Sequence, residues 1–203
     1  MSMGDADPIR PYRDEQLDEV ADLLALAYHH NPIQVAIFGG TGPEALRQRR
    51  ALFALSTPAF FTGTKVVAME DDRVVGFAHW ISSPGCHASD ETLAAVAPPL
   101  LAALDEDVAT RVLTWRQAWD ARDPEHPHCH FGPFAVHPDA QGRGLGRQML
   151  ARYCAELDRG DEPGYLETER IENVRLYEKS GFEVLSDLHV LGVQSWFMLR
   201  PKA

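Results

Sequence analysis

The sequence predicts a single α/β domain, residues 1–203, in which helices flank a central, twisted, mixed β-sheet of about seven strands. Three observations predict this fold. Short runs of β-branched and aromatic residues alternate with segments in which apolar residues recur every three or four positions. A glycine-rich turn, residues 141–146, joins a strand-like run to an amphipathic helix. A helical segment, about residues 84–127, interrupts the strand pattern and is interpreted as an insertion between the third and fourth strands.

The limits of each element follow from this periodicity and from the prolines and glycines between segments. The predicted strands span residues 9–13, 65–69, 73–81, 128–136, 165–168, 182–190 and 193–199. The predicted helices span residues 17–28, 44–56, 99–119, 145–157 and 173–179. Asn31-Pro32 and Thr57-Pro58 are expected to end the first two helices, and Gly76 is expected to mark a β-bulge.

The insertion is expected to contain one long helix that begins after Pro98-Pro99. Its apolar stripe runs from Leu101 to Trp119 in steps of three and four. Such a stripe either packs on the sheet or, together with the loop of residues 87–92, covers an acceptor pocket. The sequence leaves both interpretations open.

The amino-acid composition of the chain argues against some classes of function. The net charge of −11 argues against non-specific binding of nucleic acid, because that requires a basic surface. No apolar run approaches the roughly 20 residues that a membrane span needs, and the opening residues are polar and acidic. The three cysteines have no paired spacing and fit reduced thiols. We therefore expect a cytoplasmic protein without nucleic-acid or membrane partners, and the sequence leaves open whether it forms a homodimer.

The glycine-rich turn has the properties of an anion-binding site. Gly142, Gly144 and Gly146 allow the backbone to approach an anion closely. The first N–H groups of the following helix lack partners within the helix and lie at its positive end, so a pyrophosphate would fit there. An ordinary helix-capping turn is the simpler alternative. A Rossmann fold is disfavoured, because the glycines do not follow the order G-x-G-x-x-G.

The strand before this turn is expected to be irregular. Gly132-Pro133 interrupts it, and proline has no N–H to donate to a neighbouring strand. We expect a bulge or splay there. Backbone groups at Phe134 and Val136 would then be free to bind a ligand that lies along the strand.

Two motifs together carry a family resemblance. Gln141-x-x-Gly144-x-Gly146 follows the irregular strand, and the run LETERIENVRLYEKSGF, residues 166–182, follows about thirty residues later. In this order the motifs resemble the GNAT superfamily of acetyl-CoA-dependent N-acetyltransferases, and the likeness spans nearly the whole chain. The C-terminal part resembles the puromycin N-acetyltransferase branch of that superfamily.

The resemblance implies acetyl-CoA as the co-substrate and places its binding site. The backbone of the irregular strand would hold the pantetheine arm, at Phe134, Ala135 and Val136. The turn and the start of the helix would hold the pyrophosphate, at Gln141, Gly142, Arg143, Gly144, Leu145, Gly146 and Arg147. Asn173 and Tyr177 match the family residues that contact the cofactor from the short later helix.

The resemblance also implies that an amine attacks a thioester, which requires few protein groups. The Tyr177 hydroxyl stays protonated at neutral pH and is the expected general acid for the leaving sulfur. The general base is left open, because the fourth strand reads HCHFGPFAV and lacks the glutamate found in many relatives. Glu167, either of His128 and His130, and bulk water are the alternatives.

Histidines near the fourth strand also suggest a metal site. His126, His128, Cys129 and His130 are close in sequence, but no further ligands follow at the spacing of a structural zinc site. We therefore expect no metal.

The sequence thus predicts an N-acetyltransferase that acts directly, in a ternary complex, on the primary amine of a small molecule. A catalytically weak acetyl-CoA sensor or partner module of the same fold is the alternative.

Overall fold

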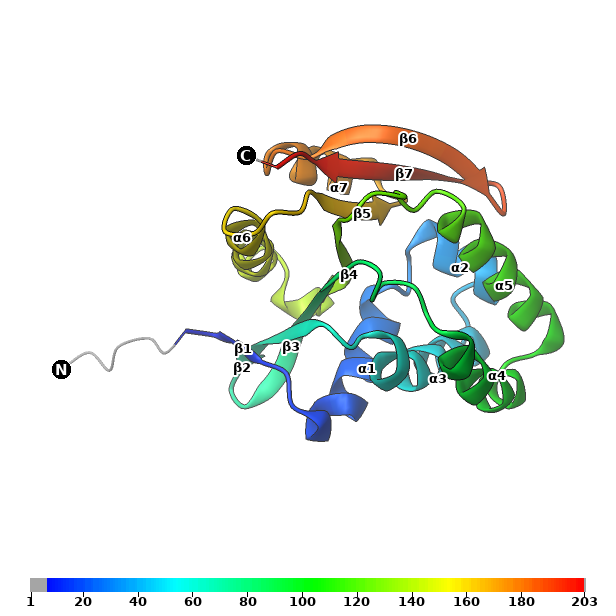
Figure 1. Cartoon of the computed structure of the whole chain (residues 1–203). Helices are drawn as coiled ribbons and strands as arrows, with labels where there is room; N and C mark the ends of the chain where they lie inside the picture. Colours follow the sequence, from blue (N-terminus) through cyan, green and yellow to red (C-terminus); the bar gives the residue numbers. More distant parts are fainter. Residues whose placement is uncertain (1–6, 203) are drawn as a thin grey trace.

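The computed structural model describes residues 7–202, which form seven strands and seven α-helices around one mixed sheet (Figure 1). The strands are β1 (Ile9–Pro11), β2 (Thr64–Glu70), β3 (Arg73–Ser82), β4 (Cys129–Val136), β5 (Gly164–Thr168), β6 (Glu183–Val190) and β7 (Val193–Arg200). The helices are α1 (Leu17–Ala27), α2 (Pro32–Phe38), α3 (Pro43–Phe60), α4 (Asp90–Ala103), α5 (Glu106–Asp120), α6 (Leu145–Leu157) and α7 (Ile171–Glu178). The predicted mixed sheet of seven strands is confirmed.

The strand order is β1-β2-β3-β4-β5-β7-β6, and β4 and β5 form the parallel pair. Only Cys129 with Gly164 and His130 with Tyr165 are paired between these two strands. Beyond His130 the strands separate, so the expected splay is confirmed. This opening in the middle of the sheet exposes polar backbone of β4.

The bulge in β4 lies where the sequence predicts it. Ala78 of β3 pairs with Phe134, and Trp80 pairs with Phe131, so Gly132 and Pro133 together oppose a single residue. The register of β2 and β3 also shifts, directly beside Gly76. Both irregularities were expected because a residue without an N–H, or without a side chain, weakens a regular ladder.

Two prolines act differently from the prediction. Pro32 begins a helix, α2, that the sequence analysis missed: the Asn31 side chain caps it by accepting a hydrogen bond from the Gln34 N–H at 3.1 Å. Pro58 lies inside the last turn of α3, which continues to Phe60. Proline costs little there because few hydrogen bonds of the helix follow it.

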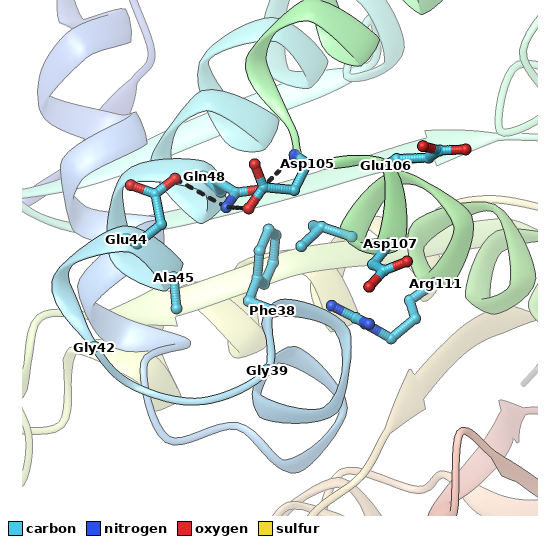
Figure 2. Close-up of a pocket in the computed structure, with 11 residues that line it drawn as sticks. Phe38, Gly39, Gly42, Glu44, Ala45, Gln48, Asp105, Glu106, Asp107 and Arg111 are labelled. Carbon is cyan, nitrogen blue, oxygen red and sulfur yellow. Dashed lines mark hydrogen bonds between the residues drawn. The ribbon is translucent and has the colours of Figure 1, made fainter.

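The insertion contains two helices, so the prediction of one long helix is wrong. Pro98 and Pro99 lie within α4, and the chain turns at Leu104 and Asp105 before α5 begins. A side chain far away in the sequence holds this turn. Gln48 of α3 accepts a hydrogen bond from the Asp105 N–H at 2.9 Å and donates one to the Asp105 carboxylate at 2.8 Å (Figure 2).

The core lies on both faces of the sheet. On one face α6 packs Met149, Leu150 and Tyr153 against the central strands. On the other face α1 and α3 pack against residues such as Phe77, and the insertion helices lie on this side in Figure 1. Within residues 7–202 no helix combines the length and apolar character of a membrane span.

Candidate active site

The turn before α6 has the geometry of a phosphate-binding site. Gly142 and Gly144 have φ angles of +77° and +83°, which favour glycine. A Cβ at Gly146 would lie 3.3 Å from the Phe134 ring, so this glycine lets the helix approach β4 closely. The helix ladder begins with the Gln148 N–H, which donates to the Gly144 carbonyl at 3.0 Å. The three N–H groups before it therefore point outward at the positive end of α6.

Two residues predicted for the pyrophosphate are held by protein contacts. The Gln141 N–H donates to the Pro138 carbonyl, and its side-chain amide donates to the Val136 carbonyl at 3.1 Å. The Arg143 guanidinium donates to the Glu70 carboxylate at 2.7 Å. Gln141 therefore braces the turn, and Arg143 joins the turn to the end of β2.

The open edge of β4 presents alternate backbone groups. Ala135 pairs with Phe77 of β3, so its polar groups face that strand, whereas those of Phe134 and Val136 face the opening. The Tyr28 hydroxyl already accepts from the Phe134 N–H and donates to the Phe134 carbonyl, both at 3.2 Å. Only part of the open edge is therefore free for a pantetheine arm, a detail that the sequence did not indicate.

One cavity of about 910 Å³ joins these parts. It runs from the glycine turn along the opening between β4 and β5 to the loops that flank the insertion. It is lined by every residue predicted for cofactor binding or catalysis: Phe134, Ala135, Val136, Gln141, Gly142, Arg143, Gly144, Leu145, Gly146, Arg147, Asn173, Tyr177, Glu167 and His130. His128, the alternative base, is fully buried beside it.

A second cavity of about 650 Å³ lies where α2 and the start of α3 meet α5 (Figure 2). Phe38, Gln48, Asp105 and Arg111 line it, and it contains none of the predicted site residues. Gln48 and Asp105 are hydrogen-bonded to each other, and Arg111 donates to the Ile37 carbonyl. This cavity therefore belongs to the contact that attaches the insertion.

Tyr177 lies on α7 and only 5% of its surface is exposed. Burial raises the pKa of its hydroxyl, and the nearby Tyr28, Glu169 and Glu167 raise it further. The hydroxyl is therefore protonated at neutral pH and able to donate. Asn173, one turn earlier, donates to the Thr168 hydroxyl at 3.2 Å.

Glu169 is a site residue that the sequence analysis missed. Its side chain is buried at the edge of the cavity, where Oε2 accepts a hydrogen bond from the Asn31 side chain at 2.9 Å. Among the described residues, Oε1 has no partner. Burial raises the pKa of Glu169 to about 7, although the bond from Asn31 opposes this. Glu169 lies one residue beyond the end of β5, so the alternation of a strand did not single it out.

A second carboxylate cluster closes the far end of the cavity. His130 Nε2 lies 2.8 Å from Glu167 Oε2, and His130 Nδ1 lies 3.7 Å from Asp123 Oδ1. Burial alone would lower the pKa of His130, but Glu167 and Asp123 outweigh it and raise the pKa to about 10. The cluster thus attracts positive charge strongly. Asp123, from the loop after α5, was not singled out by the sequence.

A comparison with known protein families identifies the family of this chain. Residues 62–184 match the model of the acetyltransferase (GNAT) domain. The chain belongs to the GNAT acetyltransferase family. The members of this family transfer acetyl groups from acetyl-CoA, and the splayed sheet and glycine turn described above fit that co-substrate.

Solved structures agree with this GNAT fold. One is a histone acetyltransferase HPA2 and related acetyltransferase from Corynebacterium glutamicum, with a TM-score of 0.68 and 22% identity over 96% of each chain. Another is arylalkylamine N-acetyltransferase 2 from Aedes aegypti, with a TM-score of 0.63 and 12% identity over 94% of this chain and 96% of that one. YncA from Salmonella typhimurium, a putative acetyltransferase solved with its cofactor acetyl-CoA, has a TM-score of 0.55 and 19% identity over 94% and 91%.

In this GNAT domain the insertion forms part of the cavity wall. Trp115 and Trp119 of α5 line the cavity, while Val108 and Val112 of the same helix are buried against α2. One edge of α5 therefore packs in a core and the other faces the cavity, and the covering of an acceptor pocket stays a prediction. Together with Tyr28, the two tryptophans give this part of the cavity aromatic walls.

Proposed function

We propose that this GNAT domain transfers the acetyl group of acetyl-CoA to the primary amine of a small molecule that has an aromatic or apolar body. The observation that carries the proposal is the single cavity. It connects the phosphate-binding turn at α6 to Tyr177, and Tyr177 to a chamber with aromatic walls and buried carboxylates. A long co-substrate and a compact acceptor would meet at Tyr177.

The protein residues fit acetyl-CoA. The outward N–H groups at the start of α6 would bind the pyrophosphate, and the Val136 N–H, which faces the opening, would contact the pantetheine arm. Bound acetyl-CoA supplies an activated acetyl group and a sulfur leaving group. Arg147 lines the same end of the cavity and adds positive charge for the phosphates.

The charges at the other end favour a cationic acceptor. Glu167 and Glu169 lie two residues apart at the end of β5, and both line the cavity. An amine arrives as an ammonium ion at neutral pH, which buried carboxylates stabilise. The aromatic rings of Trp115 and Trp119 add a surface for an apolar body and for cation–π contact.

We assign Glu169 as the general base. Its free Oε1 and its raised pKa, about 7, suit a group that takes a proton from the ammonium ion near neutral pH. His130 is the weaker choice on geometry, because its two ring nitrogens already face Glu167 and Asp123. Glu167, the candidate from the sequence, is engaged by His130 and would orient the acceptor.

Tyr177 is the proposed general acid. Glu169 removes one proton from the ammonium ion, and the neutral nitrogen then forms a bond to the acetyl carbon while the carbon–sulfur bond breaks. Tyr177 protonates the sulfur as it leaves. The second proton of the nitrogen passes to the Tyr177 oxygen and restores its hydroxyl, so the amide and the free thiol leave neutral and Glu169 keeps the first proton until it releases it to water.

Release of free thiol from acetyl-CoA tests the proposal. The amines would be 2-phenylethylamine, a linear polyamine and a lysine-containing peptide, each compared with a reaction without acceptor. The proposal expects acceptor-dependent thiol release, fastest with 2-phenylethylamine. Tight binding of acetyl-CoA without acceptor-dependent release from any amine would refute it and favour a sensor or partner module. Preference for the peptide would refute the small-molecule assignment.

A further inference from the structure

A cluster of metal-ligand side chains lies where both ends of the insertion meet β4. Cys86 comes from the loop before α4, and Asp123 from the loop after α5. His128 and His130 come from the start of β4. Cys86 Sγ lies 3.6 Å from His128 Nε2 and 3.7 Å from Asp123 Oδ2. Asp123 Oδ1 lies 3.4 Å from His128 Nε2 and 3.7 Å from His130 Nδ1.

We propose that this cluster binds one zinc ion through four side chains: Cys86, Asp123, His128 and His130. The proposal replaces the expectation of no metal that the sequence alone suggested. It does not depend on acetyl transfer.

Two of the distances within the cluster are close to the edges of a tetrahedral zinc site. Zinc bonds of about 2.3 Å to sulfur and about 2.0 Å to nitrogen or oxygen give tetrahedral edges of about 3.5 Å between sulfur and nitrogen and about 3.3 Å between nitrogen and oxygen. The distance from Cys86 Sγ to His128 Nε2 is 3.6 Å, and the distance from His128 Nε2 to Asp123 Oδ1 is 3.4 Å. The ligand atoms of Cys86, His128 and His130 all lie within 4.8 Å of one another. Cys86 lies near Oδ2 of Asp123 and the histidines lie near Oδ1, so the carboxylate would rotate to present one oxygen to the ion.

Each histidine is oriented as metal-bound histidines are. His128 Nδ1 lies 3.0 Å from the His126 carbonyl, so this nitrogen donates and Nε2 presents its lone pair to the cluster. His130 Nε2 lies 2.8 Å from Glu167 and donates to it, so Nδ1 is the nitrogen that would bind the ion, and it would release its proton on binding. In both rings the nitrogen left for the ion lies within 4.8 Å of Cys86 Sγ.

The carboxylate supplies a second, independent observation. Only 7% of the Asp123 side chain is exposed, and within residues 7–202 its Oδ1 has no hydrogen-bond partner of acceptable geometry. A buried, unpartnered carboxylate oxygen is costly unless a cation or a donor satisfies it. Its other oxygen lies 2.9 Å from His87 Nε2, which would fix the carboxylate from outside.

The same residues do not form a cysteine–histidine–aspartate catalytic triad. In a triad the nucleophile and the carboxylate approach opposite nitrogens of the histidine. Here Cys86 and Asp123 both approach Nε2 of His128, and Nδ1 is engaged by a backbone carbonyl. Convergence on one nitrogen is the arrangement of ligands around an ion.

Four protein ligands leave no open position, so the zinc would be structural. It would join residues 86 and 123, at the two ends of the insertion, to β4. Because Cys86, Asp123 and His130 also line the cavity, the ion would hold its acceptor end in shape.

Metal analysis of the full chain, with any affinity tag removed, tests the proposal. The protein would be dialysed after exposure to zinc chloride, and its zinc measured by mass spectrometry. We expect about one zinc ion per wild-type chain and about a tenth of that or less in Cys86→Ser, because serine is a poor ligand for zinc. Cys154→Ser, which removes a thiol far from the cluster, is the matched control and should keep the full content.

Cobalt substitution keeps the test decisive if Cys86→Ser does not fold. Wild-type protein loaded with Co²⁺ should show intense visible absorption typical of tetrahedral cobalt and a near-ultraviolet thiolate charge-transfer band. Folded wild-type protein that takes up neither ion would overturn the proposal. So would zinc content unchanged in folded Cys86→Ser, or a weak octahedral cobalt spectrum without the thiolate band.

Discussion

Replacing Glu169 by glutamine should stabilise the protein in a way that depends on pH. Folding raises the pKa of this carboxyl from 4.5 to about 7, so the folded state holds the proton more tightly than the unfolded state. The stability that this group contributes is fully present below pH 4.5 and is lost as the pH rises to about 7. At about 1.4 kcal/mol for each factor of ten in proton affinity, the loss is about 3 kcal/mol. Glutamine is neutral and keeps an oxygen for Asn31, so Glu169→Gln avoids this loss.

Urea unfolding at pH 4.5 and pH 8 measures the effect. The free energy of unfolding of Glu169→Gln should exceed that of wild type by up to about 3 kcal/mol at pH 8 and match it at pH 4.5. Glu178→Gln removes the same charge from an exposed position on α7 and serves as the control. A difference between Glu169→Gln and wild type that is equal at both pH values would refute the assignment of a buried, proton-binding carboxyl.

Glu169→Gln also tests the proposed role of Glu169 as the general base. In wild type, kcat/KM should rise with pH through about 7 as Glu169 loses its proton. Glu169→Gln should lose that rise and lower kcat/KM about 10²- to 10⁴-fold, the range usual for a general base. A variant that is more stable at pH 8 and retains wild-type turnover would show that Glu169 is buried for another reason.

Three further substitutions probe separate parts of the structure. Tyr177→Phe should lower kcat about 10²-fold or more, while the affinity for acetyl-CoA, measured by calorimetry, changes little. Wild-type turnover in this variant would remove Tyr177 from the mechanism. Gly144→Ala should destabilise the protein by about 1 kcal/mol and weaken acetyl-CoA binding, because φ at this position is +83°; unchanged affinity would argue against a phosphate at this turn. Tyr153→Phe should lower the free energy of unfolding in urea by about 1–3 kcal/mol, because the buried Tyr153 hydroxyl donates to the Cys129 carbonyl at 2.6 Å. The KM for acetyl-CoA should stay unchanged. An unchanged free energy of unfolding would mean that the carbonyl finds another donor.

Local chemistry was sufficient to predict the sheet, the bulge in β4 and the backbone of the glycine turn. Gly132-Pro133 cannot continue a regular ladder, and the bulge appears there. The glycines of the turn allow positive φ angles, and two of the three adopt them. These features depend on the backbone preferences of a few adjacent residues, which a sequence displays directly.

Helix boundaries in and near the insertion depended on contacts between distant residues. Pro32 could end one helix or begin another, and the capping bond from Asn31 decides between them. The break between α4 and α5 lies at Asp105 because Gln48, 57 residues earlier, binds it. Neither the hydrophobic period nor proline placement carries that information.

The sequence by itself determined the family, the sheet and the glycine turn, because each depends on residues that lie close together in the chain. Tertiary structure decided the side chains at the other end of the cavity. Glu169 becomes a buried carboxyl only when Asn31 is placed against it, and Cys86 and Asp123 reach His128 and His130 only when both ends of the insertion return to β4. Side-chain chemistry at such sites depends on burial and on distances of a few ångströms between residues far apart in sequence, and folding alone sets both.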